Sequence, residues 1–409
     1  MDLQTVRQRV GAVLEQTPTV DIHTHVYSEA FGDLLLWSID ELLTYHYLVA
    51  ELFRYRPDLA YDEFWAMPKA RQADLIWNEI FVRNTPVSEA ARGVVTTLHR
   101  LGVDAGEKKL DRIRAFFGGF STGEYIDRVF ELANIRRAVM TNDPFEPREQ
   151  AVWNSGAHTD KRFAAALRLD RLLNDYAGGA RELSAQGFHV SSAIDQSTAA
   201  AVHEFLKTWI EKMKPAYMAV SLPPDFRMDD GSDRARLIAE CVLPIAREHR
   251  LPFAMMIGVK KRVNPALGDA GDSVGKADIN VLEGLARDYP DVRFLVTMLS
   301  RENQHELCVA ARKFGNLLPF GCWWFLNNPS IVREMTAERF EMLGLTMIPQ
   351  HSDARVLDQL IYKWAHSREI IADVLAERYA GLMRAGWAVT QEDMERDANR
   401  ILGGQLLME

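Results

Sequence analysis

Two histidines one residue apart, His23 and His25, are the first residues in the chain whose types and spacing suggest chemistry. They end a short apolar segment that is expected to form a strand, and residues i and i+2 of a strand share a face. Two imidazoles on one face can chelate a divalent metal ion, and imidazole suits zinc, iron or nickel. Asp21 falls on the same face one step deeper, where its carboxylate could support the site. The chain has 11 histidines, so chance also explains one such pair.

An aspartate near the end of the last expected strand, Asp353 in Thr346–Asp353, could complete this metal site. The first and last strands of a closed barrel are neighbours, so Asp353 would lie beside the histidine pair. A coordination position would then stay open for substrate or water. Arg355 follows two residues later and would also face the barrel mouth. The alternative is that Asp353 only caps the helix that follows it.

The elements that must position these residues alternate between short β-branched segments and segments of helical period. This alternation favours βα units around a parallel sheet. Nine segments qualify as strands, one more than an eight-stranded barrel needs, and His189–Asp195 is the weakest of them. A doubly wound sheet is disfavoured because no G-x-G-x-x-G or phosphate-binding loop follows a strand. The nine segments are Thr19–His25, Arg137–Asp143, Phe163–Asp170, His189–Asp195, Tyr217–Leu222, Pro252–Gly258, Val292–Met298, Leu317–Phe325 and Thr346–Asp353.

Chain length fits a barrel with two helical additions. Residues 26–135 have helical periodicity, for example over Ile39–Tyr55 and Ala70–Arg83, and so do residues 356–409. The remaining residues number close to the ~250 that are typical of the fold. We therefore predict a distorted (β/α)8 TIM barrel formed by residues 1–25 and 136–355. A helical insertion at 26–135 and C-terminal helices at 356–409 would pack on it.

Composition excludes several classes of protein. Of 409 residues, 47% are hydrophobic, yet no apolar run reaches the ~18 residues that span a bilayer, so we expect no membrane association. A net charge of −9 argues against a nucleic-acid partner. Three cysteines without C-x-x-C spacing exclude a disulfide scaffold and a thiolate zinc site. Together with the lack of a signal-peptide pattern, they predict a cytoplasmic enzyme.

A histidine pair that ends strand 1 and an aspartate that ends strand 8 resemble the amidohydrolase superfamily. Within it, the chain most resembles the uronate (glucuronate) isomerase family over nearly its whole length. Two segments depart from the usual family pattern: Asp353-Ala354-Arg355 replaces D-S-R, and Leu167-Arg168-Leu169-Asp170 replaces F-R-P-D, which indicates a divergent branch. The matching segments are Asp40–Arg54, Thr141–Pro144, Leu167–Asp170, Pro319–Pro329, Pro349–Arg355 and Leu357–Leu402.

The resemblance implies aldose–ketose isomerisation of a small uronic acid, by proton transfer from C2 to C1 through an enediolate. The substrate pair would be D-glucuronate and D-fructuronate, or D-galacturonate and D-tagaturonate. It also implies one divalent metal ion, with Zn²⁺ the first candidate, and we expect a homo-oligomer. The implied metal ligands are His23, His25 and Asp353; the implied catalytic residues are Asp353, Tyr47 and Arg355; the implied substrate-binding residues are Arg168, His46 and Arg355.

The roles of these residues follow the chemistry. Asp353 would take a hydroxyl proton to open the sugar ring, and the two arginines would hold carboxylate or hydroxyl groups bidentately. Tyr47 would move the carbon-bound proton as a phenolate favoured by nearby cations. Without the resemblance, Tyr47 is better explained by an aromatic helix face, whereas an ion pair with Asp170 explains Arg168 as well as a substrate role does.

Three other functions compete with an isomerase. A binuclear hydrolase is unsupported, because the segments expected to end strands 4 to 6 contain no histidine. A mononuclear-metal lyase or decarboxylase would use the same ligands and the same arginines. A sugar-binding relative without catalysis would have no need for three convergent ligands.

Overall fold

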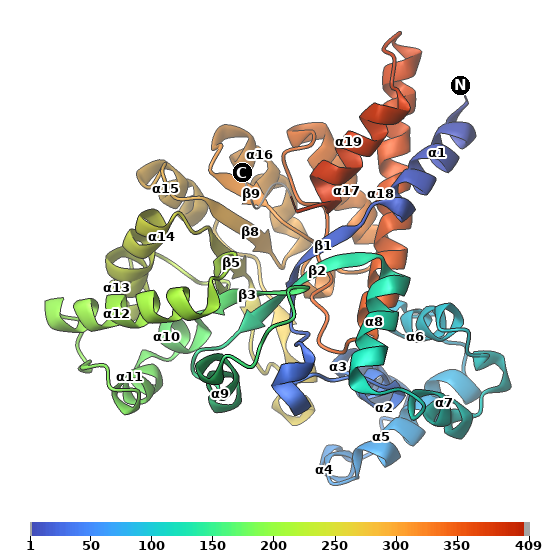
Figure 1. Ribbon diagram of the computed structural model, residues 1–409, viewed down its shortest axis with the longest axis horizontal. Helices are drawn as coiled ribbons and strands as arrows, with labels where there is room; N and C mark the ends of the chain where they lie inside the picture. Colours follow the sequence, from blue (N-terminus) through green and yellow to red (C-terminus); the bar gives the residue numbers. More distant parts are fainter. Residues whose placement is uncertain (1, 405–409) are drawn as a thin grey trace.

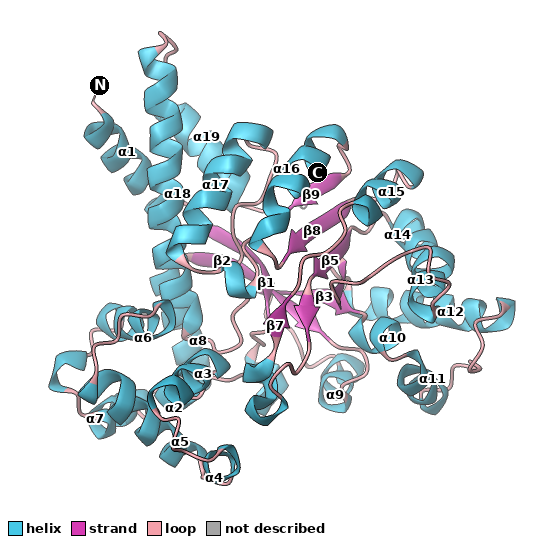
Figure 2. Ribbon diagram, turned by 180° about the vertical axis from the view of Figure 1, so that it is seen from behind, coloured by secondary structure: helices cyan, strands magenta, loops and turns pink. Residues whose placement is uncertain are grey.

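The barrel is built from one curled sheet of seven parallel strands in the order β1-β2-β3-β4-β5-β8-β9 (Figures 1 and 2). The computed structural model describes residues 2–404. A separate antiparallel pair, β6 (Val259–Lys260) and β7 (Ser273–Val274), follows β5. The barrel strands are β1 Thr19–Thr24, β2 Ile135–Asn142, β3 Phe163–Arg168, β4 Met218–Leu222, β5 Phe253–Ile257, β8 Phe294–Met298 and β9 Leu317–Pro319. The predicted distorted (β/α)8 barrel is confirmed.

The eighth side of the barrel is an irregular segment, so the prediction of a strand at Thr346–Asp353 is wrong. In this segment only Ile348 forms a β-bridge, to Phe320. Pro349 has no N–H to donate, and Asp353 has a φ of 50°, which no strand can continue through. Single hydrogen bonds to β1 close the barrel instead: the Asp353 N–H donates to the His23 carbonyl at 3.0 Å, and the His25 N–H donates to the Ala354 carbonyl at 2.7 Å.

The ninth candidate, His189–Asp195, forms no strand, as its weak pattern indicated. It is the loop before helix α12 (Gln196–Met213), and Asp195 caps that helix by accepting from the Thr198 N–H at 2.8 Å. The other seven candidates each overlap one strand of the barrel.

A set of helices between β1 and β2 lies to one side of the barrel, and others cover its outer face (Figure 1). The predicted helix Ile39–Tyr55 is two helices, because Tyr45 between them is extended with a ψ of 142°. The predicted helix Ala70–Arg83 is α5, continued by a π-helical turn over Trp77–Arg83. The α-helices are α1 Leu3–Gln16, α2 Ile39–Leu43, α3 His46–Tyr55, α4 Tyr61–Trp65, α5 Lys69–Ile76, α6 Glu89–Arg100, α7 Leu110–Phe117, α8 Thr122–Ala133, α9 Pro147–Ser155, α10 Asp170–Asn174, α11 Tyr176–Ala185, α12 Gln196–Met213, α13 Asp233–Leu237, α14 Leu243–His249, α15 Asn280–Asp288, α16 Gln304–Lys313, α17 Pro329–Leu343, α18 Gln359–Arg384 and α19 Gln391–Leu402.

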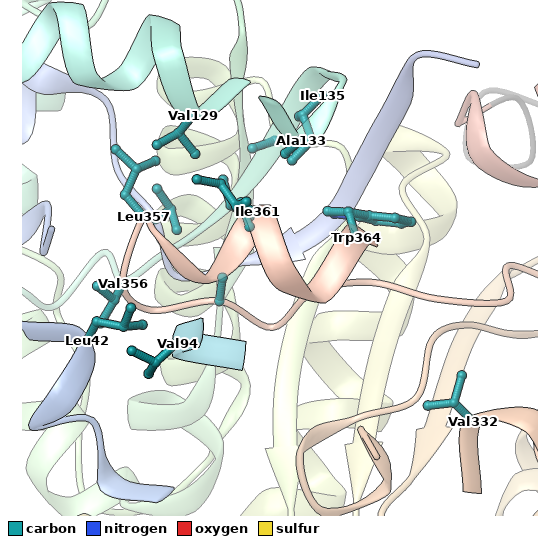
Figure 3. Packing of buried hydrophobic residues seen from close by; sticks show 14 of the residues in the cluster. Leu42, Val94, Val129, Ala133, Ile135, Val332, Val356, Leu357, Ile361 and Trp364 are labelled. Carbon is teal, nitrogen blue, oxygen red and sulfur yellow. The ribbon is translucent and has the colours of Figure 1, made fainter. Parts of the chain in front are cut away.

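Helix α18 joins the insertion to the barrel. It packs against α1, α6, α8 and α17. Figure 3 shows Ile361 of α18 and Leu357 just before it close to Val129 of α8. The division into units at 1–25 with 136–355, 26–135 and 356–409 stays a prediction, and residue 1 and residues 405–409 lie outside the described residues. Among the described residues, no helix combines the length and the apolar character needed to cross a membrane.

Candidate active site

The three predicted metal ligands come together at the barrel mouth. Asp353 Oδ1 lies 3.6 Å from His23 Nε2 and 3.5 Å from His25 Nε2. One potential ligand atom from each residue lies within 4.8 Å of the others. His23 and Asp353 are buried, while His25 keeps some exposure toward the mouth. Two imidazole nitrogens and a carboxylate in this arrangement are the donor set of a divalent metal site with an open position.

The hydrogen bonds of His23 fix which of its nitrogens could bind a metal ion. The Tyr217 hydroxyl donates to the Ile22 carbonyl at 2.6 Å, so it can only accept from His23 Nδ1, which lies 3.0 Å away. His23 Nε2 then carries the lone pair, and this buried atom has no hydrogen-bond partner among the described residues. Burial also lowers the pKa of His23 well below its usual value, which favours the neutral ring. A metal ion would satisfy this atom, so the residues fit the implied group.

Tyr217→Phe is expected to weaken metal binding about 10- to 100-fold, because His23 Nδ1 would keep only the longer contact with the Thr141 hydroxyl, at 3.3 Å, which can donate as well as accept and so does not fix the tautomer. The measurement is competition for zinc between the protein and a chromophoric chelator. Tyr176→Phe is a matched control, since the Tyr176 hydroxyl also donates to a backbone carbonyl, that of Ser191, far from the site. Equal zinc affinity in the two variants would contradict the role of Tyr217.

Asp353 is held as a carboxylate in a strained backbone position. Its φ of 50° places it in the left-handed region, which is uncommon outside glycine and is tolerated best by aspartate and asparagine. Burial acts to raise the pKa of Asp353, but the hydrogen bond and charge interactions with His25, His23 and Lys363 outweigh it. The pKa of Asp353 therefore lies well below its usual range. Lys363 is itself buried and donates to the Ser352 carbonyl at 2.6 Å.

Asp21 supports the site through the backbone rather than through an imidazole. Its carboxylate accepts from the Ser352 N–H at 3.0 Å and from the Trp364 indole N–H at 2.8 Å. Asp21 thereby fixes the residue next to Asp353 and ties α18 to β1. Asp21 therefore has the supporting position that its place in the strand predicted.

Five of the predicted residues line one cavity above the metal ligands: His25, His46, Arg168, Asp353 and Arg355. His23 lies buried beneath this cavity. The remaining lining residues were not assigned a role from the sequence; they are Tyr45, Ser221, Met256, Lys261, Asp269, Asp272, Trp323 and Trp324.

Two arginines give the cavity local positive charge in an acidic chain. Arg168 lines the cavity and is also paired with Asp170, so both arrangements considered for it are present. Its Nε lies 3.0 Å from one oxygen of the Asp170 carboxylate. The charge of Asp170 raises the pKa of Arg168, so this guanidinium stays cationic. Arg355 is less constrained, with 43% of its side chain exposed and its Nη1 3.7 Å from Asp269 Oδ2.

Tyr47 lies behind the cavity lining, next to Tyr45 and His46. Its ring centroid is 4.5 Å from that of His46, and Lys363 Nζ lies 5.8 Å from its ring. The phenol oxygen is buried and has no hydrogen-bond partner among the described residues. Burial raises the pKa of Tyr47 well above its usual value, so the nearby cation does not produce a phenolate in this state. Burial likewise lowers the pKa of His46 to about 3, and that imidazole is neutral.

Three features of the site were not predicted from the sequence. Lys363 carried a usable signal, because a lysine inside the apolar run Leu360–Trp364 is rarely buried without a polar partner. Tyr45 reaches the cavity because the chain breaks between α2 and α3, and the predicted continuous helix Ile39–Tyr55 did not include this break. The loop between β6 and β7 contributes Asp269 and Asp272, and no periodic pattern marked it.

The fold and the cluster of His23, His25 and Asp353 define a (β/α)8-barrel protein with a candidate metal site at its mouth. No family model matches the chain, and no curated protein matches it. A uronate isomerase from Bacillus halodurans C-125 is 52% identical in sequence, with a TM-score of 0.98, over 100% of this chain and 97% of that one. The chain therefore belongs to the uronate isomerase family, and the resemblance found in its sequence is confirmed.

Two more distant structures share the fold. A uronate isomerase from Thermotoga maritima superimposes with a TM-score of 0.81 at 14% identity, covering 99% of this chain and 97% of that one. A glucuronate isomerase from Caulobacter crescentus superimposes with a TM-score of 0.80 at 15% identity, covering 99% of this chain and 94% of that one. At these identities the likeness supports the architecture alone.

Proposed function

We propose that this protein interconverts an aldose uronate and its ketose isomer, either D-glucuronate and D-fructuronate or D-galacturonate and D-tagaturonate. The observation that carries the proposal is one cavity lined by two members of the His-His-Asp cluster, His25 and Asp353, together with Arg168 and Arg355. The arginines supply the bidentate, positively charged donors that a sugar carboxylate needs. Family membership supplies the reaction class.

The proposed cofactor is one divalent metal ion held by His23, His25 and Asp353. We propose Zn²⁺, because a set of two imidazoles and one carboxylate is common among zinc sites. When bound, the ion would supply positive charge that polarises a substrate oxygen.

In the proposed reaction Asp353 and Tyr47 move the protons, and the two arginines hold the substrate. Asp353 accepts the proton of the anomeric hydroxyl as the ring opens and passes it to the ring oxygen, which becomes the C5 hydroxyl of the open chain. Arg168 and Arg355 hold the carboxylate and neighbouring hydroxyls, which fixes C2 in place. Tyr47, after it has lost its own proton to become a phenolate, then carries a proton from C2 to C1 through an enediolate, while the hydroxyl proton of O2 passes to O1. Burial raises the pKa of Tyr47 in the free protein, so this ionisation must accompany substrate binding. Because Tyr47 lies behind Tyr45 and His46, this role requires these rings to shift when substrate binds.

Proton NMR in deuterated water tests the proposal, with metal-supplemented protein and either D-glucuronate or D-galacturonate. The expected result is a 2-keto product that retains all carbons and carries partial solvent deuterium at C1. The two sugars differ only at C4, so the experiment also shows which epimer is used. Release of carbon dioxide or formation of an unsaturated product would favour the lyase alternative. No change in either sugar would contradict the proposal.

Arg355→Lys is expected to lower kcat/KM about 10- to 100-fold, mainly through KM, because lysine keeps the charge but loses the bidentate fork. Steady-state kinetics on the preferred uronate provide the measurement. Arg227→Lys is the control, since Arg227 also pairs with an aspartate, Asp229, at 2.9 Å on the exposed surface. An unchanged KM in Arg355→Lys would exclude Arg355 from carboxylate binding.

The proposed setting of the enzyme is the cytoplasm, as a homo-oligomer. Cys241, Cys308 and Cys322 are all buried and unpaired, which is compatible with a reducing compartment. Sedimentation velocity on the full chain measures the oligomeric state, and a purely monomeric protein at micromolar concentration would contradict this part of the proposal.

A further inference from the structure

The segment between β5 and β8 forms a hairpin that covers the barrel mouth. Its two arms meet at their base, where the Gly275 N–H donates to the Gly258 carbonyl at 2.9 Å. Gly258 has a φ of 120°, and a Cβ there would lie 2.9 Å from the Gly275 oxygen, so only glycine allows this close crossing. The tip of the hairpin reaches the helical insertion, where the Trp65 indole N–H donates to the Ala266 carbonyl at 2.9 Å.

Two acidic residues of this hairpin line the cavity, and they differ in how firmly they are held. Asp272 is buried and accepts from Lys261 Nζ at 2.7 Å and from the Arg262 N–H at 2.8 Å. Asp269 is 78% exposed, and its partner among the described residues is Arg355, at 3.7 Å. A long, exposed ion pair of this kind is weak, so it can exchange readily.

The pair formed by Asp269 and Arg355 stands between two cavities. Both residues line the inner cavity above the metal ligands. Both also line a larger outer cavity of about 610 Å³ between the hairpin tip and helices α2 to α5. A substrate that enters through the outer cavity therefore meets this ion pair before it meets the metal ligands.

We infer that Asp269 is an internal competitor for the substrate carboxylate: it occupies Arg355 in the free enzyme and gives way when a uronate binds. This inference rests on the proposed function, because it takes Arg355 as the carboxylate-binding group. An aspartate side chain and a sugar carboxylate present the same charged group to the guanidinium, so only one of them can hold its fork at a time. Asp269 thereby sets the affinity for carboxylate-bearing sugars without contacting the reacting carbons.

The test is Asp269→Asn, which removes the charge and nearly preserves the shape. We expect KM for the preferred uronate to fall about two- to fivefold, the range that an exposed ion pair supports, without a proportional fall in kcat. In an Arg355→Gln background the same change should have no effect on kcat/KM, because the competition requires the guanidinium. Asp229→Asn is the matched control, since it removes an equivalent charge from the exposed pair with Arg227.

Each other outcome overturns the inference. An unchanged or raised KM would make Asp269 a wall of the cavity or a hydrogen-bond partner of the substrate. An equal fall in KM in the wild-type and Arg355→Gln backgrounds would mean that Asp269 acts through the electrostatic potential of the whole cavity and not through Arg355. If the wild-type protein isomerises no uronate, the proposed function fails first. Calorimetric binding of D-gluconate, with the carboxylate-free sorbitol as comparison, still tests Asp269 in that case.

Discussion

Replacement of Asp353 by asparagine is expected to lower kcat/KM about 10²- to 10⁴-fold, the range that a positioned acid–base group contributes. The change removes the proposed proton acceptor for ring opening and one of the three proposed metal ligands. Asparagine is the informative replacement because it tolerates the left-handed backbone at this position, where φ is 50°. The fold should therefore survive, and the lost activity can be assigned to the carboxylate.

Three measurements on Asp353→Asn separate chemistry from structure. Steady-state kinetics give the loss of activity, metal analysis by mass spectrometry gives the occupancy of the site, and thermal unfolding checks the fold. Asp229→Asn again controls for the loss of one acidic group at an exposed position. Activity within tenfold of the wild type in a well-folded Asp353→Asn protein would remove Asp353 from the mechanism.

The second large effect is expected for Tyr47→Phe, which should depress kcat about 10²-fold or more and change KM little. Phenylalanine keeps the ring that packs against Tyr45 and His46 and removes only the hydroxyl, so the fold should survive. Hydrogen–deuterium exchange at C2 of the substrate, followed by NMR, reports the affected step directly.

Tyr45→Phe is the matched comparison, because Tyr45 is the neighbour that lines the cavity. A larger loss of exchange in Tyr45→Phe than in Tyr47→Phe would transfer the proton-carrying role to Tyr45. Normal turnover in both variants would mean that Tyr45 and Tyr47 serve only in packing and that another residue is the base at C2.

The parts of the site that follow from strand geometry could be predicted from the sequence. The two-residue spacing of His23 and His25 fixed their common face, and barrel closure brought Asp353 beside them. Arg168 could be placed for the same reason, because it ends β3 at the mouth. In each case a short periodic segment determines where the side chain points, and the fold then brings the ends of the strands together.

The parts that depend on irregular backbone could not be predicted. Pro349 and the left-handed Asp353 turn the eighth strand into an extended segment held by single hydrogen bonds. The break at Tyr45 places Tyr45 in the cavity lining and leaves Tyr47, the predicted catalytic residue, behind it. Asp269 lies in a loop that a hydrogen bond ties to Trp65, a residue distant in the sequence.

The ties between β1 and α18 also bear on how the protein folds. The bonds of Asp21 to Ser352 and Trp364 span 331 and 343 residues, and that of Thr19 to Arg368 spans 349. Contacts this distant along the chain are slow to form, because closing the long loop between them costs conformational entropy before the contacts contribute any stabilising free energy. During synthesis, the strand that carries both histidines leaves the ribosome long before its partners exist. We expect metal-binding competence to arise late, after α18 has docked.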